Sequence, residues 1–388
     1  MIVRILNGRI ATPRQVLDSA DIAVAGECIA AIGPAGSGRA DATIDLDGGW
    51  LLPGFIDCQV NGGGGVLFND HADLEAIAAI GAAHAGFGTT GFLPTLISDT
   101  AKQIAAALDA VDAAIVQGVP GVLGIHIEGP FINAVKRGIH EAHRIRPLDS
   151  DTLALLTAPR RGRVMVTLAP EQCAPEDIAT LTRHGVIVSA GHSDATYDAA
   201  KRAIHAGLSG VTHLFNAMSP LHHRAPGLVG AALDSDIWCG LIVDDAHLHP
   251  AAVRIAVKAK GVHRLMLVTD AMPTVGTDAT EFMLQGKRIT VRNGVCVFSD
   301  GTLAGTHLDM ASALRNTVAL TGLSVADAAT MASTTPAHFL SLSDQRGSLE
   351  VGLRADWVSL DRDLRPTGTW IGGIPLHSDA PARLSASL

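Results

Sequence analysis

Short apolar runs alternate with amphipathic segments through most of the chain. The apolar runs predict strands at eight places, residues 51–58, 90–96, 121–127, 163–168, 186–190, 210–214, 238–243 and 264–269. Between many of them apolar residues recur at helical spacing, as in residues 72–86, 101–118, 194–207 and 249–261. Wholly apolar strands that alternate with helices indicate a parallel sheet covered by helices. Eight such strands predict an α/β fold of the (β/α)8 TIM-like barrel type, with an open doubly wound sheet as the alternative.

The two ends of the chain have a different pattern. Residues 1–50 contain short strand-like runs separated by turn dipeptides such as Asn7-Gly8 and Asp47-Gly48, and residues 347–361 repeat this style. We therefore predict a small β-sandwich domain that is built from both chain termini. The expected boundaries are 1–52 for its first part, 53–342 for the catalytic barrel and 343–388 for its second part.

Composition narrows the class of protein. Of 388 residues, 47% are hydrophobic and 17% are charged, which excludes a disordered chain. The formal net charge of −9 argues against a protein that wraps nucleic acid through phosphate contacts. The five cysteines never form a C-x-x-C pattern, which is typical of reduced thiols in the cytoplasm. Neither a signal peptide nor a membrane span of about 18 apolar residues is predicted, so we expect a cytoplasmic enzyme.

Polar residues follow four of the predicted barrel strands. Glu128 ends the run GVLGIHIE, His192 follows VIVSAG, His213 follows GVT, and Asp270 follows LMLVT. In a barrel of this type the catalytic groups lie at the carboxyl ends of the strands. A lone histidine at a strand end is more often structural, and Asp270 alone is compatible with a helix N-cap. Four strand ends that carry Glu, His, His and Asp are hard to attribute to chance.

These residue types together indicate metal-assisted hydrolysis. One Glu and two His form a sound ligand set for Zn²⁺ or Fe²⁺ and leave a coordination position open for water. A metal of this kind lowers the pKa of bound water from about 15.7 towards 7. Asp270 fits a general base and acid beside that water. The predicted activity is therefore the hydrolysis of an amide or ester bond.

Motifs spread over nearly the whole chain resemble the amidohydrolase superfamily and, within it, the N-acetylglucosamine-6-phosphate deacetylase family. They occur in family order: LLPGFIDCQVNG (51–62), GIHIEGPF (124–131), AGHSDA (190–195), THLFNAM (212–218), RAPGLVG (224–230), LVTDAM (267–272), DGTLAGT (300–306) and ADWVSLD (355–361). The combination of H-x-E-G-P-F, G-H-S and T-H-L-F-N-A-M is far more specific than any single motif. The resemblance also implies the barrel and the small β domain.

The resemblance implies a role for each of several residues at the strand ends. Glu128, His192 and His213 correspond to the ligands of a divalent metal, and Asp270 corresponds to the catalytic acid and base. His140, in KRGIHEAH, corresponds to a histidine that orients or polarises the acetyl carbonyl group. Zinc is the expected metal, while iron, cobalt and manganese also suit this ligand set.

A phosphate site and a subunit contact are implied in the same way. The residues that correspond to the phosphate site are Asn216, the Ala217 backbone, Arg224 and His247. In related enzymes the Arg and His at these positions reach the site of a neighbouring subunit, which implies a homodimer with a shared phosphate site. His307, in AGTHLDM, falls in a segment that lines the sugar pocket in relatives. For His126 we expect a supporting role beside Glu128.

The expected reaction is the deacetylation of N-acetyl-D-glucosamine 6-phosphate to D-glucosamine 6-phosphate and acetate in amino-sugar catabolism. The alternatives are an amidohydrolase for a different N-acyl sugar phosphate or N-acyl amino acid, and a metal-free barrel scaffold, which the intact ligand set opposes. Many amidohydrolases hold a second metal with His-x-His after the first barrel strand, but this chain has Gln59-Val60-Asn61 there. Amides are poor ligands for such metals, so we expect one metal ion per chain.

Overall fold

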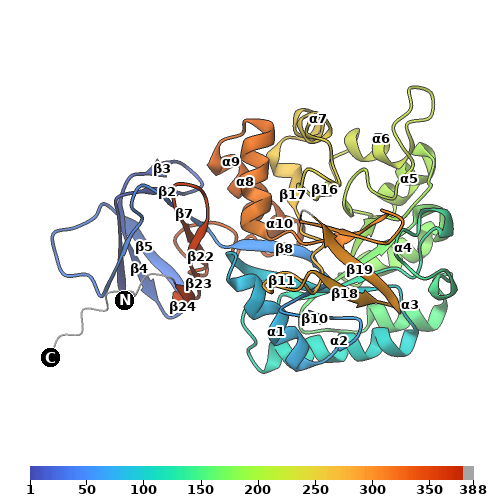
Figure 1. Ribbon diagram of the computed structural model, residues 1–388, viewed down its shortest axis with the longest axis horizontal. Helices are drawn as coiled ribbons and strands as arrows, with labels where there is room; N and C mark the ends of the chain where they lie inside the picture. The colour runs from blue at the N-terminus through green and yellow to red at the C-terminus, as the bar shows by residue number, and fades with distance from the viewer. Residues whose placement is uncertain (293, 379–388) are drawn as a thin grey trace.

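Eight parallel strands form the central sheet of the computed structural model, which describes residues 1–292 and 294–378. Neighbouring strands follow one another in chain order: β8 (Phe55–Val60), β11 (Thr89–Ile97), β12 (Gly124–Glu128), β13 (Arg163–Leu168), β14 (Ile187–Ala190), β15 (Gly210–Val211), β16 (Trp238–Leu241) and β17 (Leu265–Leu267). The backbone N–H of Asn61 donates to Ala271 (2.9 Å) and that of Asp270 donates to Gln59 (3.0 Å). These bonds join the end of β8 to the segment after β17, so the sheet forms the predicted barrel and not an open sheet (Figure 1).

Helices surround the barrel and cover the outer faces of its strands, so the strands are buried on both faces. Every residue of β8, β11 and β12 is buried. The helices are α1 (Leu74–Ala85), α2 (Ala101–Val116), α3 (Ser150–Thr157), α4 (Pro175–Arg183), α5 (Tyr197–His205), α6 (Gly227–Leu233), α7 (Pro250–Lys260), α8 (Met310–Thr321), α9 (Val325–Ala329) and α10 (Thr335–Phe339). The side chains of Asp73, Thr100, Asp149, Thr196 and Asp309 cap five of these helices by accepting a backbone N–H of the first turn. None of the helices described is long and apolar enough to cross a membrane.

The small domain consists of two sheets that share an apolar core. One sheet has the order β5-β4-β1-β6, with β1 (Ile2–Leu6), β4 (Ala20–Ala25), β5 (Cys28–Gly33) and β6 (Ala42–Asp45). The other has the order β24-β23-β22-β7-β2-β3, with β2 (Arg9–Ala11), β3 (Val16–Leu17), β7 (Trp50–Pro53), β22 (Trp357–Leu360), β23 (Pro366–Ile371) and β24 (Ile374–Ser378). Ile5, Ile22, Leu51 and Trp357 meet in the core between them. The expected sandwich from both termini is confirmed, and it lies beside the barrel (Figure 1).

Two sequence predictions differ from the structure in this region. The apolar run 51–58 holds parts of two strands, β7 in the small domain and β8 in the barrel, because the chain crosses between domains at Gly54. A Cβ atom at Gly54 would lie 2.2 Å from the Thr90 hydroxyl, so only glycine fits this crossing. In the segment 347–361 only the last part, from Trp357, is a strand. We still propose boundaries at 52/53 and 342/343; residues 379–388 of the third segment lie outside the described residues.

A four-stranded antiparallel sheet at the barrel mouth was not predicted. It comprises β18 (Glu281–Leu284), β19 (Lys287–Arg292), β20 (Val295–Val297) and β21 (Leu303–Thr306). Its apolar side chains pack with Ile97, the last residue of β11, and with Leu67 and Met272, which follow β8 and β17 in the chain. The turn between β18 and β19 has positive φ at both Gln285 (49°) and Gly286 (78°), as tight hairpins require. The run EFMLQGKRITV, in which polar and apolar residues are mixed around a Gln-Gly turn, could have indicated this hairpin from the sequence.

Candidate active site

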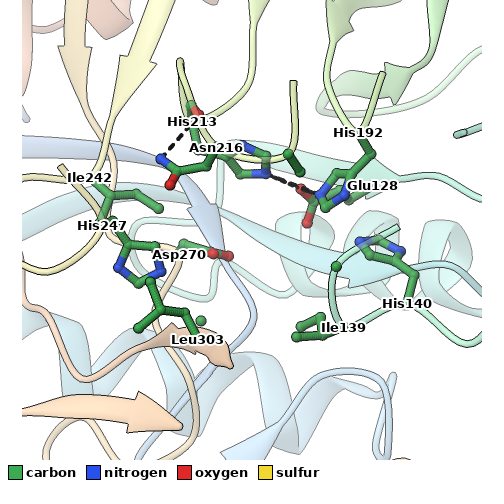
Figure 2. A pocket seen from close by; sticks show the side chains of 13 residues that line it. Glu128, Ile139, His140, His192, His213, Asn216, Ile242, His247, Asp270 and Leu303 are labelled. Carbon is green, nitrogen blue, oxygen red and sulfur yellow. Dashed lines mark hydrogen bonds and ion pairs between the residues drawn. The ribbon is translucent and has the colours of Figure 1, made fainter. Parts of the chain in front are cut away.

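A cavity of about 170 Å³ opens at the carboxyl ends of the barrel strands (Figure 2). Eight residues predicted from the sequence line it, namely Glu128, His140, His192, His213, Asn216, Ala217, His247 and Asp270. Gly138, Ile139, Ile242, Leu303 and Gly305 complete its wall, and the last two come from the mouth sheet that was not predicted. Two predicted residues, Arg224 and His307, do not line the cavity.

Three atoms with the chemistry of metal ligands converge at one side of this cavity. Oε1 of Glu128 lies 3.2 Å from Nε2 of His192 and 3.0 Å from Nε2 of His213, and the two Nε2 atoms are 3.1 Å apart. Nδ1 of His192 is 2.9 Å from the backbone oxygen of Lys136, which can only accept. His192 therefore carries its hydrogen on Nδ1 and presents a lone pair on Nε2, as a metal ligand must.

His140 lies close enough to form a second possible ligand group. Glu128, His140 and His192 offer ligand atoms that lie within 4.8 Å of one another. However, the backbone N–H of Ser98 donates to Nδ1 of His140 (3.2 Å), and the Ser98 hydroxyl lies 2.7 Å from the same atom. Nδ1 must then hold a lone pair, so the hydrogen of the neutral ring is on Nε2. This tautomer is a hydrogen-bond donor at Nε2 and not a ligand, which favours His213 as the third ligand.

The charges of these buried groups depend on one another. Burial disfavours the ionised form of Glu128, but its close contacts with the imidazole rings of His192 and His213 outweigh burial and hold its pKa well below the ordinary value. Burial likewise opposes protonation of His213, but the bond to Glu128 raises the pKa of this histidine. For His140, burial and the neighbouring His192 lower the pKa to about 3, so that its ring is neutral.

Asp270 faces the same cavity from the end of the last barrel strand. Burial and the nearby charge of Glu128 raise the pKa of Asp270 to about 6. Its Oδ1 accepts hydrogen bonds from Nε2 of Gln59 (3.0 Å) and Nδ2 of Asn61 (2.6 Å). Its Oδ2 makes no hydrogen bond within the part of the chain that the structure describes, so this oxygen is the one available for proton exchange.

The backbone is strained where it presents three of these side chains. His192 (φ 48°), His213 (φ 35°) and Asp270 (φ 52°) all adopt left-handed backbone conformations, which residues other than glycine rarely take. Each lies two or three residues after the last residue of its strand, so the turn directs the side chain into the cavity. Strain of this kind clusters at functional sites, where the surrounding structure compensates its cost of about 1–3 kcal/mol per residue.

His247 has a partner that sequence analysis missed. Its Nδ1 lies 2.7 Å from Oδ2 of Asp244, so the ring donates to this carboxylate. Burial opposes the ionisation of Asp244, but the bond from His247 outweighs it and lowers its pKa. Asp244 also accepts the backbone N–H groups of Ala246 and His247. The sequence signal that could have indicated this pair is the carboxylate of Asp244 three residues before His247.

The remaining predicted residues lie outside the cavity. His307 is half-buried, and its Nδ1 lies 2.9 Å from the hydroxyl of Thr274. Arg224 is exposed on the loop between β15 and α6, which extends away from the barrel (Figure 1). His126 is buried beneath the cavity between the hydroxyls of Thr95 and Thr167. Burial lowers the pKa of His126 to about 4.

This fold and this site are those of a hydrolase family. The chain belongs to the amidohydrolase family, whose model matches residues 50–375. Membership implies a divalent metal, for which the Glu and His side chains of the cavity are available.

Individual relatives are deacetylases of amino-sugar phosphates. The chain is 44% identical to an N-acetylgalactosamine-6-phosphate deacetylase of Shewanella sp. (strain ANA-3), over 88% of this chain and 86% of that protein. It is 35% identical to the N-acetylglucosamine-6-phosphate deacetylase of Haemophilus influenzae, over 95% of this chain and 98% of that one. A crystal structure of N-acetylglucosamine-6-phosphate deacetylase from Pasteurella multocida matches with a TM-score of 0.93 and 35% identity, covering 97% of this chain and 99% of that one.

Proposed function

We propose that this protein hydrolyses the acetamide of N-acetyl-D-glucosamine 6-phosphate to give D-glucosamine 6-phosphate and acetate, as a step in amino-sugar catabolism. The convergence of Glu128, His192 and His213 beside Asp270 in one cavity carries this proposal. The relatives named for this reaction support the choice of substrate. The direct test is an assay for free amine and acetate with metal-loaded protein. No release of either product from this substrate would contradict the proposal.

The donor set of the cavity fits one divalent metal ion, with Glu128, His192 and His213 as its ligands and zinc as the expected metal. Two imidazoles and a carboxylate suit zinc and leave a position open. When bound there, the ion lowers the pKa of a water molecule and polarises a carbonyl oxygen. The lone pair that the Lys136 carbonyl enforces on Nε2 of His192 supports this assignment.

The side chains around this position have complementary tasks. Asp270 takes a proton from the attacking water at Oδ2 and transfers it to the amide nitrogen as the C–N bond breaks. Gln59 and Asn61 hold Oδ1 and thereby fix the orientation of the carboxylate. His140, neutral and with its hydrogen on Nε2, donates to the acetyl oxygen as negative charge develops there.

We expect close to one equivalent of metal per chain after dialysis. Gln59 stands where many amidohydrolases have a histidine ligand of a second metal, and its Nε2 amino group lies between the carboxylates of Glu128 and Asp270, 3.1 and 3.0 Å from their oxygens. This group donates hydrogen bonds and cannot ligate a cation. Elemental analysis of dialysed protein measures the ratio. Two tightly bound equivalents would contradict a single-metal site.

The phosphate group of the substrate requires a cation that the cavity of one chain does not supply. The lining residues that the structure describes include no Lys or Arg, and only Asn216, the Ala217 backbone and His247 are available for a phosphate. The exposed loop that carries Arg224 extends from the barrel. We infer a homodimer in which Arg224 completes the phosphate site of the partner subunit, with His307 contributing to the sugar pocket.

Removing Arg224 should therefore weaken binding of the phosphorylated sugar selectively. Hydrogen bonds to charged groups are worth roughly 1.5–3 kcal/mol, so Arg224→Ala should raise KM about 10- to 150-fold for the phosphorylated sugar only. The control is the unphosphorylated sugar, whose KM should hardly change. Mixed Arg224→Ala and Asp270→Asn subunits should regain activity through hybrid dimers. Equal effects on both sugars would show that Arg224 does not bind phosphate.

A second candidate substrate is N-acetyl-D-galactosamine 6-phosphate. The relative from Shewanella, at 44% identity, is named for the galactosamine compound, whereas the relatives at 35% and 38% from Haemophilus influenzae and Homo sapiens are named for the glucosamine compound. The ratio of kcat/KM for the two epimers decides between them. A larger value for the galactosamine epimer would replace the proposed substrate and leave the proposed chemistry unchanged.

A cytoplasmic location follows from the same proposal. All five cysteines are free, and Cys58, Cys173, Cys239 and Cys296 are buried, as is typical of proteins kept in a reducing compartment. Phosphorylated sugars are also substrates that cells retain inside the membrane. Both observations support a cytoplasmic enzyme.

A further inference from the structure

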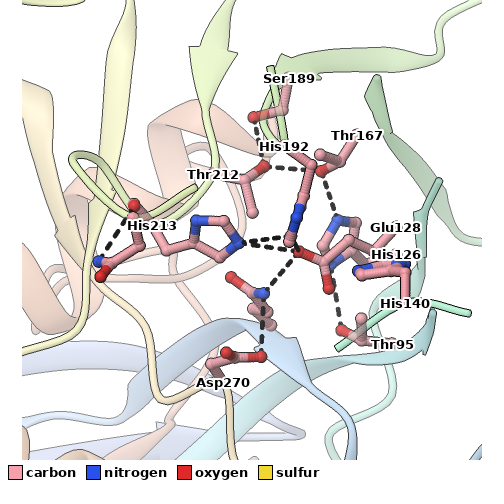
Figure 3. A network of polar contacts seen from close by, with 12 residues as sticks. Thr95, His126, Glu128, His140, Thr167, Ser189, His192, Thr212, His213 and Asp270 are labelled. Carbon is pink, nitrogen blue, oxygen red and sulfur yellow. Dashed lines mark hydrogen bonds and ion pairs between the residues drawn. The ribbon is translucent and has the colours of Figure 1, made fainter. Parts of the chain in front are cut away.

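Five buried side chains form a continuous chain of hydrogen bonds across the barrel interior, directly beneath the candidate metal ligands (Figure 3). They are Thr95, His126, Thr167, Thr212 and Ser189, here called the polar belt, and none of them is more than 2% exposed. Successive contacts measure 3.1 Å (Thr95 to His126 Nδ1), 2.7 Å (His126 Nε2 to Thr167), 2.6 Å (Thr167 to Thr212) and 2.8 Å (Thr212 to Ser189). Polar groups buried this deeply are costly unless every one is satisfied.

The polar belt has one arrangement of donors in which every hydrogen finds an acceptor. Each hydroxyl has one hydrogen, and a neutral imidazole donates at one nitrogen and accepts at the other. If Thr95 donates to His126, then His126 donates to Thr167, and the hydrogen of one hydroxyl among Thr167, Thr212 and Ser189 is left without an acceptor among the described residues. If donation runs the other way, from Ser189 through Thr212 and Thr167 to Nε2 of His126 and from Nδ1 of His126 to Thr95, every hydrogen finds an acceptor, and the Thr95 hydroxyl donates to the backbone oxygen of Leu93 at 3.3 Å. The second direction is therefore the stable one, and it puts the hydrogen of His126 on Nδ1.

The polar belt touches the backbone of all three candidate ligands. Thr167 is the register partner of Glu128 on the neighbouring strand. Thr212 directly precedes His213. A Cβ atom on Gly191, the residue before His192, would lie 2.7 Å from Cγ2 of Thr167. The central contact between Thr167 and Thr212 thus ties together the strand ends from which Glu128, His192 and His213 project.

We propose that the polar belt is a positioning element for the metal site, with donation running from Ser189 to Thr95 and His126 held as its Nδ1–H tautomer. This proposal rests on the metal site of the proposed function. The three ligands come from three strand ends, and two of them, His192 and His213, adopt left-handed backbone conformations, so their relative placement depends on contacts that hold these conformations. A directed chain of hydrogen bonds fixes it, because no member can rotate without breaking a bond to its neighbour.

The first test is Thr167→Val, which removes one hydroxyl and keeps the methyl group that packs on Gly191. We expect the dissociation constant of Zn²⁺, measured by chelator competition, to rise about tenfold, the lower end of effects reported for groups that orient metal ligands. The visible spectrum of the cobalt-substituted protein should change as well. Thr167→Ser restores the hydroxyl and should restore both values. Thr317→Val is the matched control, because Thr317 is a buried threonine of α8 that bonds only to its own helix.

The second test measures the tautomer of His126 in the unaltered protein and does not depend on any variant folding. In ¹⁵N-histidine-labelled protein, long-range ¹H–¹⁵N correlations should show His126 protonated at Nδ1 and unprotonated at Nε2. The opposite tautomer would overturn the proposed direction. Unchanged zinc affinity and cobalt spectrum in Thr167→Val would overturn the positioning role. Neither readout uses a sugar. If the protein fails to hydrolyse the proposed substrate but the zinc affinity, cobalt spectrum and tautomer are as expected, only the proposed function is refuted.

Discussion

Replacing Asp270 with asparagine is expected to lower kcat by about 10²–10⁴-fold, the usual contribution of a general acid and base. Asparagine can still accept the hydrogen bonds that Gln59 and Asn61 donate to Oδ1, so the local structure is kept. Its amide nitrogen stands in place of Oδ2 and cannot take a proton. Steady-state kinetics with the phosphorylated sugar measure the loss. Activity within tenfold of the unaltered protein would reduce Asp270 to a structural role.

The pH profile separates proton transfer from structural damage. Burial and the charge of Glu128 raise the pKa of Asp270 to about 6, and the residue must be ionised to act as a base. Activity should therefore fall as the pH drops below that value, with the midpoint moved lower when a bound cation stabilises the carboxylate. The residual activity of Asp270→Asn should lack this acidic limb. A limb that persists in the variant would have to arise from another group.

Replacing Glu128 with glutamine is expected to abolish tight metal binding and, with it, turnover. An amide is a weak ligand for zinc. The remaining ligands, His192 and His213, are neutral, so the site also loses the negative charge that offsets the charge of the zinc ion. Because loss of a mere partner of a ligand costs about 10–100-fold in metal affinity, loss of a ligand should exceed 100-fold. Chelator competition and elemental analysis after dialysis measure this change.

The matched control for this variant is Glu176→Gln, which removes the same charge from an exposed position on α4. It should bind one equivalent of metal with unchanged affinity. His140→Gln provides a further comparison, since His140 belongs to the alternative ligand group. It should reduce turnover and leave metal content unchanged. Loss of metal in His140→Gln together with retention in His213→Gln would assign the third ligand position to His140.

The barrel could be predicted because its strands are buried on both faces and appear as uninterrupted apolar runs. The same property obscured the domain crossing at Gly54, since WLLPGFIDC is apolar on both sides of it. The mouth sheet from β18 to β21 was missed because its strands are short and partly exposed, with mixed polar and apolar residues. Strands that are buried on both faces could therefore be predicted from the sequence, whereas short and partly exposed strands could not.

The candidate site was predictable where side chains end a strand or lie shortly after one, as with Glu128 and Asp270. Its supporting contacts were not, because they join residues that are distant in the chain. Ser98 fixes the tautomer of His140 from 42 positions away, and Gln59 reaches Asp270 from 211 positions away. Sequence order contains no signal for such pairs, since they depend on how the barrel closes.

The position of β7 in its sheet has a consequence for the order in which the protein is completed during synthesis. β7 (Trp50–Pro53) lies between β2 (Arg9–Ala11), which is made before it, and β22 (Trp357–Leu360), which is made about 300 residues later. At translation rates of about 5–20 residues per second, its open edge waits roughly 15–60 s for a partner. An unpaired strand edge invites pairing with other chains. The edge of β7 is thus protected only late in synthesis, and the nascent chain depends on chaperones to shield this edge until β22 is made.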